Sequence, residues 1–163
     1  MTSDKRPYPE GHETAQTRDM DGAILTVLRC RDHFCGYARL PKRPVTEDGY
    51  HGILTYVPVH GGITYSHTDD DGSTVYGFDC AHLDDEHDPQ LRDVEWLFAE
   101  CERMARAVLI AGEFEPRYLA ETDTDKRAAV LDEFIAACAE RAGTEPGAPH
   151  NFGTMLNMLF GKL

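Results

Sequence analysis

The chain has 163 residues, of which 29 are acidic and 16 are basic, so its formal net charge at pH 7 is −13. That length suits one domain with its own hydrophobic core, and the acidic balance argues against a nucleic-acid coat or a binder of anionic membranes, because both depend on clustered Lys and Arg. No apolar stretch reaches the roughly 18 residues of a transmembrane helix and no secretory signal follows the N-terminus, so we expect a cytoplasmic protein whose five cysteines are free thiols.

Residues 1–21 combine prolines, a glycine and many charges with few apolar side chains, which predicts a flexible N-terminal arm. The sequence then predicts strands at 24–28, 35–40, 53–59, 63–67 and 74–80. Pro58 lies inside the third run and favours an edge position or a strand end. Asp71 and Gly72 separate the last two runs, and an Asp-Gly pair between β-prone segments indicates a tight hairpin.

The hydrophobic period changes after residue 88. Asp88 and Pro89 form a helix-start signal, and apolar residues from Val94 to Leu109 recur on one helical face. A long helix is therefore predicted over about residues 89–111, with Gly112 as its stop. A second helix is predicted over about residues 124–142.

Strands followed by helices predict an α+β fold. We expect a mostly antiparallel sheet of four or five strands over about residues 23–80, packed by the long helix and the second helix. Residues 143–149 have the composition of a linker, and residues 151–163 predict a short C-terminal helix. With the arm excluded, residues 22–163 form a single domain.

A polar cluster is predicted at the end of the hairpin that lies far from its turn. If Asp71 and Gly72 form a two-residue loop, Thr64 faces Asp79 and Gly61 faces His82, and directly opposed side chains share a face. A shift of this register by one residue would move Asp79 to the other face. Glycines permit close approach and leave backbone N–H groups as donors. The expected ligand-contacting residues are His60, Gly61, Gly62, Thr64, Tyr65, Phe78, Asp79 and His82.

Several interpretations of this cluster stay open. His60, Asp79, His82 and Asp85 are candidate ligands of a divalent metal ion, because imidazole and carboxylate suit zinc, manganese or iron. His60 and His82 are also a candidate catalytic acid and base, with Asp79 orienting one imidazole. In a purely structural interpretation, Asp79 and His82 cap a turn that leads into the long helix.

The same groups also suit a polar ligand such as a nucleotide. The two glycines would then contact phosphate, and Tyr65 or Phe78 would stack on a base. Because the chain is so acidic, a phosphate group needs local positive charge, for which Arg39 and Arg43 are candidates.

Cys30, His33 and Cys35 resemble half of a zinc site, which Cys80 and His82 would complete. Alternate residues of a strand point to opposite faces, and the paired knuckle turns of common zinc sites are missing. A structural zinc ion is therefore the less favoured prediction. The acidic run at 69–71 lacks the full calcium-loop pattern and predicts a solvated hairpin tip.

Two sequence blocks carry a resemblance to a known family. They are His-Gly-Gly-Ile-Thr-Tyr at residues 60–65 and Gly-Phe-Asp-Cys-Ala-His at residues 77–82, followed by an acidic amphipathic helix around residues 95–102. Together they resemble an uncharacterised family of small proteins from tailed bacteriophages and bacteria, over about residues 30–110. The resemblance implies a setting in the bacterial host cell, where small phage proteins sequester or degrade nucleotide-derived immune signals.

We therefore expect a protein that binds or sequesters a small, nucleotide-derived ligand as an anti-defence factor. One alternative is a metal-dependent hydrolase or phosphoesterase that uses His60, Asp79, His82 and Asp85. A second alternative is an acidic inhibitor that docks on a host enzyme. The expected partners are a small polar ligand or a host protein, not nucleic acid or membrane.

Overall fold

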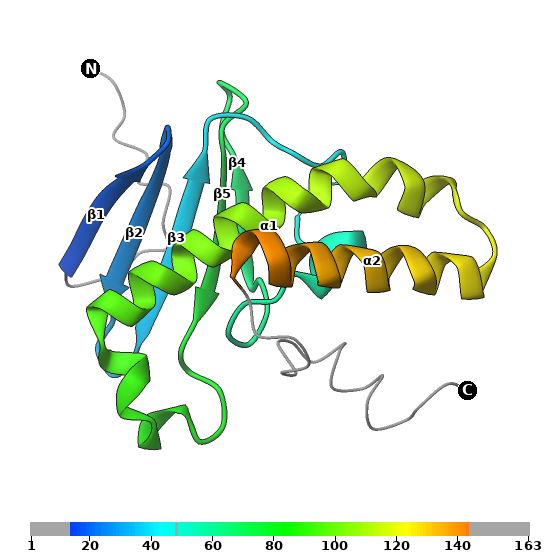
Figure 1. Cartoon of the computed structure of the whole chain (residues 1–163). Coiled ribbons are helices and arrows are strands. Elements are labelled where there is room, and N and C mark those ends of the chain that lie inside the picture. Colours follow the sequence, from blue (N-terminus) through cyan, green and yellow to red (C-terminus); the bar gives the residue numbers. More distant parts are fainter. Residues whose placement is uncertain (1–13, 48, 144–163) are drawn as a thin grey trace.

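The computed structural model describes residues 14–47 and 49–143, and it shows an antiparallel sheet with two α-helices (Figure 1). The α+β prediction is confirmed. In chain order the elements are β1 (Thr14–Met20), β2 (Ala23–Arg29), β3 (Phe34–Leu40), the 3-10 helix η1 (Gly52–Tyr56), β4 (Tyr65–Thr68), β5 (Thr74–Asp79), the 3-10 helices η2 (Asp85–His87) and η3 (Pro89–Arg92), α1 (Val94–Ala120) and α2 (Thr124–Ala142). The strand order across the sheet is β1-β2-β3-β5-β4.

Strand β1 was not predicted. Residues 14–20 pair with β2, so the expected flexible arm is wrong for this part of the chain, while residues 1–13 lie outside the described residues. Asp21 and Gly22 join the two strands with φ angles of 50° and 89°, as a type I′ hairpin turn requires. The residues of β1 from Gln16 to Asp19 are exposed and polar, so hydrophobic patterning does not reveal this edge strand.

The predicted strand at residues 53–59 is also wrong. Its first part forms η1, and the following residues run extended without pairing to a described strand. Ile53, Leu54, Val57 and Val59 are all buried, so the run lacks the alternation of a half-buried strand, and Pro58 has no N–H to give to a ladder. η1 packs against both helices instead.

Helix α1 is longer than predicted and begins later. Residues 89–92 form η3, and α1 continues through Gly112 to Ala120. A Cβ atom on Gly112 would lie 2.5 Å from the carbonyl oxygen of Pro44. Gly112 is therefore a point of close approach between the helix and the preceding loop, not a helix stop.

Helix α2 has the predicted limits. Its N-cap, Asp123, accepts hydrogen bonds from the backbone N–H groups of Asp125 and Lys126, each at 3.0 Å. Gly143 follows the last turn with a φ of 69°. These are the side-chain N-cap and left-handed C-cap that end helices. The predicted linker after Gly143 and the predicted helix at 151–163 lie outside the described residues.

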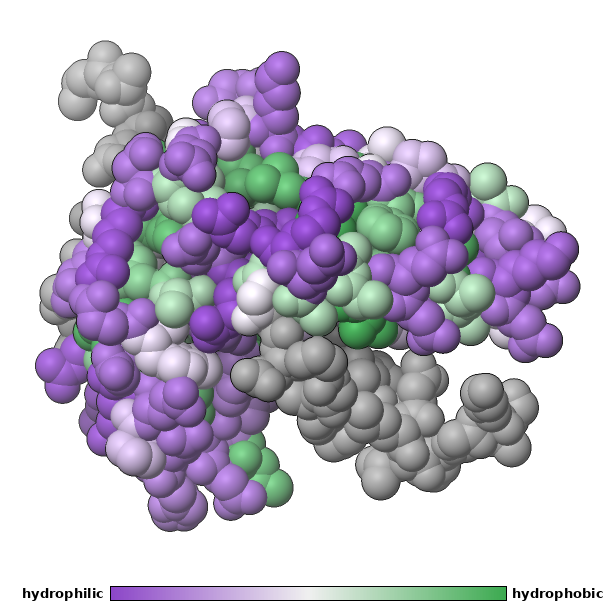
Figure 2. Space-filling model, in the orientation of Figure 1, coloured by the Kyte–Doolittle hydropathy of each residue, from purple (hydrophilic) through white to green (hydrophobic). Residues whose placement is uncertain are grey.

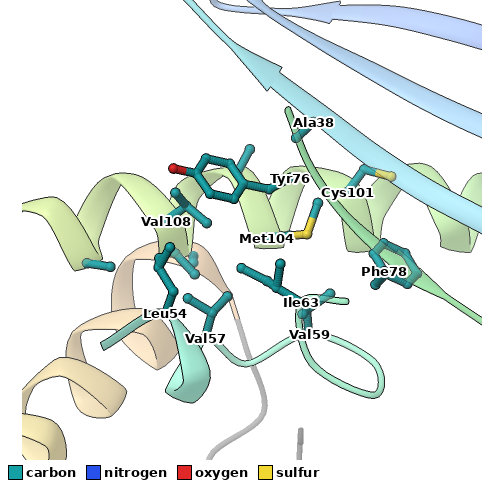
Figure 3. Packing of buried hydrophobic residues seen from close by; sticks show 14 of the residues in the cluster. Ala38, Leu54, Val57, Val59, Ile63, Tyr76, Phe78, Cys101, Met104 and Val108 are labelled. Carbon is teal, nitrogen blue, oxygen red and sulfur yellow. The ribbon is translucent and has the colours of Figure 1, made fainter. Parts of the chain in front are cut away.

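The helices cover one face of the sheet. α1 crosses that face in contact with β2 and β3, and its second half extends beyond the sheet, where α2 packs beside it (Figure 1). Tyr76 and Phe78 from β5 meet Met104 and Val108 from α1 in the core between the layers (Figure 3). A smaller cluster on the opposite face contains Leu28, Cys30, Cys35, Tyr37 and Val75.

Hydrophilic side chains dominate the outer surface of the helical layer, as the net charge of −13 leads one to expect (Figure 2). Among the described residues, neither helix has an apolar stretch that would cross a membrane.

The β4–β5 hairpin differs from the prediction by one residue in register. Tyr65 lies opposite Gly77, where the two-residue loop placed Phe78 opposite it, and the last pair is Thr68 with Thr74. The connection is therefore longer than Asp71-Gly72. The side chain of Asp71 accepts a hydrogen bond from the Ser73 backbone N–H at 2.9 Å, which stabilises the wider turn.

Aromatic packing fixes this register. A Cβ atom on Gly77 would lie 2.4 Å from the ring of Tyr37, so that ring occupies the space above the glycine. Tyr65 meets the same ring edge-on, with the ring centroids 5.5 Å apart. A shift of β4 by one residue would turn Tyr65 to the other face of the sheet, away from the Tyr37 ring.

Replacing Glu115 with alanine is expected to lower the free energy of unfolding by about 1–3 kcal/mol. Its buried carboxylate accepts hydrogen bonds from the backbone N–H of Thr46 at 2.7 Å and of Glu47 at 3.2 Å, and so fixes the loop after β3 to α1. Urea unfolding monitored by circular dichroism measures the change. Glu113→Ala, at an exposed position on the same helix, is the control and is expected to lower the free energy of unfolding much less. Equal decreases in the two variants would contradict the anchoring role of Glu115.

Candidate functional site

The turn that follows β5 brings His82 and Asp85 together. The backbone N–H of Asp85 donates to the carbonyl oxygen of His82 at 3.1 Å, and Asp84 has a φ of 73° at the start of η2. The Asp85 side chain folds back over this turn. Its Oδ2 accepts from the backbone N–H of His82 at 2.9 Å and lies 3.0 Å from Nδ1 of the same residue.

His60 reaches the same carboxylate oxygen from a different segment. Its Nε2 lies 3.0 Å from Oδ2 of Asp85, and its ring meets the His82 ring edge-on, with the centroids 5.4 Å apart. The His60 ring also meets the ring of Trp96, from the first turn of α1, edge-on with 6.0 Å between the centroids. Asp85 therefore holds two imidazoles whose residues lie 25 and three positions away in the sequence.

Gly61 makes this meeting possible. Its φ is +66°, and a Cβ atom at this position would lie 2.0 Å from Cε1 of His82. A side chain would therefore occupy the space of the imidazole, and the left-handed backbone would strain any residue other than glycine. Gly61 and His82 do come together, but not as the opposed hairpin pair that was predicted, because both lie outside the β4–β5 ladder.

The three side chains offer one ligand atom each within 4.8 Å of one another. The side chain of Asp85 is only 10% exposed. Its burial alone would raise the pKa of this carboxyl, but hydrogen bonds from His60 and from the backbone and ring of His82 outweigh burial, so the pKa lies below its usual value. The site thus presents an ionised carboxylate between two imidazoles.

Glu100 supports the site from α1 and was not predicted. Its buried carboxylate accepts the backbone N–H of His60 at 2.7 Å and the Nε–H of Arg103 at 2.8 Å. The sequence holds a signal for it, because Glu100 lies three residues after Leu97 and four before Met104, on the apolar stripe of the helix. A carboxylate on that stripe must have a polar partner.

Asp79 supports the turn but is not part of the three-residue cluster. Its Oδ2 accepts from the hydroxyl of Thr64 at 2.9 Å, and its Oδ1 accepts from the backbone N–H of Ala81 at 3.1 Å. The closest approach to the His82 ring nitrogen is 4.0 Å. Asp79 and Thr64 do meet, although they are not an opposed pair in the observed register. The turn-capping interpretation describes Asp79 best.

Three of the predicted ligand-contacting residues have their groups engaged elsewhere or lie away from this cluster. The backbone N–H of Gly62 donates to the carbonyl oxygen of Val59 at 2.9 Å and is not available to a ligand. Phe78 is 1% exposed in the core under α1, so it cannot stack on a base. Tyr65 packs against Tyr37 on the opposite face of the sheet.

The arginines expected to cover the site lie elsewhere. Arg39 pairs with Asp69 at the hairpin tip, with 2.9 Å between Nη2 and Oδ2, and Arg43 donates to the carbonyl oxygen of Thr46 at 3.1 Å. A hollow of about 430 Å³ opens beside the cluster instead, and Arg92 is the arginine that lines it among the described residues. Asp32, His33, His82, Asp84 and Asp85 also line it.

Comparisons with known proteins give no relative from which to transfer a function. No protein-family model, no curated protein and no solved structure matches the chain. The resemblance to a phage family therefore stays a prediction, and function has to be argued from the site itself.

Proposed function

We propose that the protein binds a divalent metal ion through His60, His82 and Asp85 and uses it to hydrolyse a small polar substrate. The observation that carries this proposal is that one ligand atom of each side chain lies within 4.8 Å of the other two. Two imidazoles and a carboxylate suit zinc, manganese or iron. Three protein ligands also leave positions for water and substrate, as in catalytic metal sites.

The ligand spacing supports an ion at this place. The ring nitrogens of His60 and His82 each lie 3.0 Å from Oδ2 of Asp85. Two ligand atoms at about 2.1 Å from an ion lie about 3.0 Å apart at a bond angle of about 90°, and about 3.4 Å apart at the tetrahedral angle. An ion could therefore replace the protons of the two imidazole–carboxylate hydrogen bonds with little movement of the side chains.

The chain's own residues would organise the reaction. The bound ion would lower the pKa of a coordinated water and so supply a nucleophile near neutral pH. Glu100 fixes the backbone of His60, and Gly61 leaves room for the His82 ring. Arg92, on the wall of the adjoining hollow, would offer positive charge to an anionic group such as the phosphate of a nucleotide-derived substrate, beside the carboxylates of Asp84 and Glu86 that line the same hollow.

The hollow also supports a second function, which is the binding of a nucleotide-derived ligand without turnover. In that case His60 and His82 would contact polar atoms of the ligand, and denaturation would release the ligand intact. The phage–host setting that the sequence suggests fits either function. An acidic inhibitor of a host enzyme would instead tolerate changes at both histidines and lose activity when surface carboxylates are neutralised.

Metal binding is tested with Mn²⁺ and the full chain, after removal of metal with a chelator. Mn²⁺ is chosen because it prefers carboxylate and imidazole to thiolate. We expect one ion per chain in isothermal titration calorimetry, and no saturable binding by the His82→Ala variant. His87→Ala is the matched control, because His87 is exposed and lies outside the cluster, so it is expected to bind like the original chain.

Turnover is then measured on a panel of nucleotides and phosphodiesters with Mn²⁺ present. Hydrolysis that needs both the ion and His82 supports the enzyme, whereas recovery of an unchanged ligand after denaturation supports sequestration. Equal Mn²⁺ binding by the His82→Ala variant and the original chain would overturn the proposed metal site.

A further inference from the structure

A second cluster of metal-ligating side chains lies where β2 turns into β3, at the end of the sheet where β5 also ends (Figure 1). Cys30, His33 and Cys35 each offer a ligand atom, and these three atoms lie within 4.8 Å of one another. The backbone N–H of Cys30 donates to the carbonyl oxygen of His33 at 2.9 Å, which closes the turn. The cluster therefore belongs to one short connection of fixed geometry.

The sulfur atoms have the spacing of a thiolate metal site. The Sγ atoms of Cys30 and Cys35 are 3.6 Å apart. Two thiolates at about 2.3 Å from a zinc ion lie about 3.8 Å apart at the tetrahedral angle, whereas a disulfide brings the sulfurs to about 2.05 Å. Neither sulfur is in a disulfide, so the observed spacing fits ligation and not a covalent bond.

His33 is oriented for ligation by its neighbour. Its Nδ1 lies 2.8 Å from Oδ1 of Asp32, so this carboxylate holds the ring and favours the tautomer that leaves a lone pair on Nε2. Metal-bound histidines commonly carry such a carboxylate on the other ring nitrogen. Three donor groups and one orienting group thus come from six consecutive residues.

The surroundings give an ion access and local positive charge. A hollow of about 400 Å³ beside the cluster is lined by Cys30, Asp32, His33 and three arginines. These arginines, Arg29, Arg31 and Arg92, form no ion pair with any other residue in the described ranges. Burial raises the pKa of the Cys35 thiol, and the neighbouring Cys30 sulfur raises it further, so a bound ion would have to displace the thiol proton.

Cys80 does not complete the cluster, contrary to the arrangement weighed from the sequence. Its backbone N–H donates to the carbonyl oxygen of Phe34, but its side chain lies in the core under α1. Cys30 and Cys35 belong to the cluster on the opposite face of the sheet. Burial also raises the pKa of the Cys80 thiol to about 12, which suits an unreactive core residue.

We propose that Cys30, His33 and Cys35 bind one zinc ion, with a fourth position left for water or an external ligand. This site is distinct from the His60, His82 and Asp85 cluster in its donor atoms, and the two clusters border one hollow, to which His33 and His82 both contribute. Thiolate and imidazole ligands select zinc, whereas imidazole and carboxylate also accept manganese. The proposal does not depend on the proposed hydrolase activity.

Cobalt(II) is the probe that separates the two sites, because only a thiolate ligand gives an intense sulfur-to-cobalt charge-transfer band in the near ultraviolet. The full chain, reduced and freed of metal, is titrated with Co²⁺ and then with Zn²⁺. We expect a band that saturates at one equivalent, disappears as Zn²⁺ is added, and persists in the His82→Ala variant. It is expected to be lost in the Cys35→Ala variant and retained in Cys138→Ala, where a buried cysteine lies outside the cluster.

His33→Gln keeps both sulfurs and changes a half-buried loop residue, so it tests the site even if a cysteine variant fails to fold. We expect it to weaken Zn²⁺ binding at least tenfold. The absence of a charge-transfer band in the reduced chain would overturn the proposal. A mass lower by two hydrogens in freshly purified protein, with no bound metal after reduction, would also overturn it and assign the pair to a disulfide.

Discussion

Replacing Gly61 with alanine is expected to weaken Mn²⁺ binding by about 100-fold or more, because the new methyl group takes the place of the His82 imidazole. The added Cβ would lie 2.0 Å from Cε1 and 2.3 Å from Nε2 of that ring. The ring must turn away, and Asp85 then loses one of its two imidazole partners. Titration calorimetry with Mn²⁺ measures the effect.

Gly72→Ala is the matched control for this experiment. Gly72 has a φ of +84°, but a Cβ atom there would meet nothing within 4 Å. Both variants carry the same kind of backbone strain, about 1–2 kcal/mol for a left-handed residue. Only Gly61→Ala is expected to lose the ion. Equal Mn²⁺ affinities in the two variants would show that His82 does not need the space above Gly61.

Replacing Phe134 with alanine is expected to lower the free energy of unfolding by about 3–5 kcal/mol. The side chain is fully buried where α2 packs against α1, and its ring lies 5.9 Å from that of Phe114. Removing it leaves a cavity in the contact between α1 and α2. Urea unfolding followed by circular dichroism gives the loss.

Leu119→Ala is the comparison for Phe134→Ala, because Leu119 is a large apolar residue of α1 that is 44% exposed. Leu119→Ala is expected to lower the free energy of unfolding by only a small fraction of the amount expected for Phe134→Ala. The folded Phe134→Ala protein should still bind Mn²⁺ with unchanged affinity, since α2 supplies none of the metal-ligating side chains. A cost below about 1 kcal/mol for Phe134→Ala would contradict the packing of α2 described above.

Local signals fixed the helices well, except where another segment approached them. The limits of α2 follow from an N-cap aspartate and a terminal glycine, and both signals lie within the segment itself. The prediction that α1 ends at Gly112 was wrong. A glycine is needed there because the carbonyl oxygen of Pro44, which is remote in sequence, lies close to the helix. The sequence does not distinguish a glycine that ends a helix from a glycine that allows another segment to approach the helix closely.

Strand prediction failed where burial did not alternate. β1 exposes a polar surface at the sheet edge, and only the turn pair Asp21-Gly22 marks it. Most of the segment 53–59 is buried and its β-prone residues predict a strand, although it packs against the helices. Pairing partners, and not propensity, decide whether such segments join a sheet.

Apolar periodicity and helix caps predicted the α+β class, the two helices and the central strands, because these signals act over a few neighbouring residues. The histidine-rich stretch also indicated His60 and His82, with Asp85 beside them. That Asp85, not Asp79, joins the two histidines, and that Glu100 of α1 holds the backbone of His60, could be seen only in the folded chain. These residues lie outside the β4–β5 ladder, so their contacts depend on how the segments flanking that hairpin pack against α1.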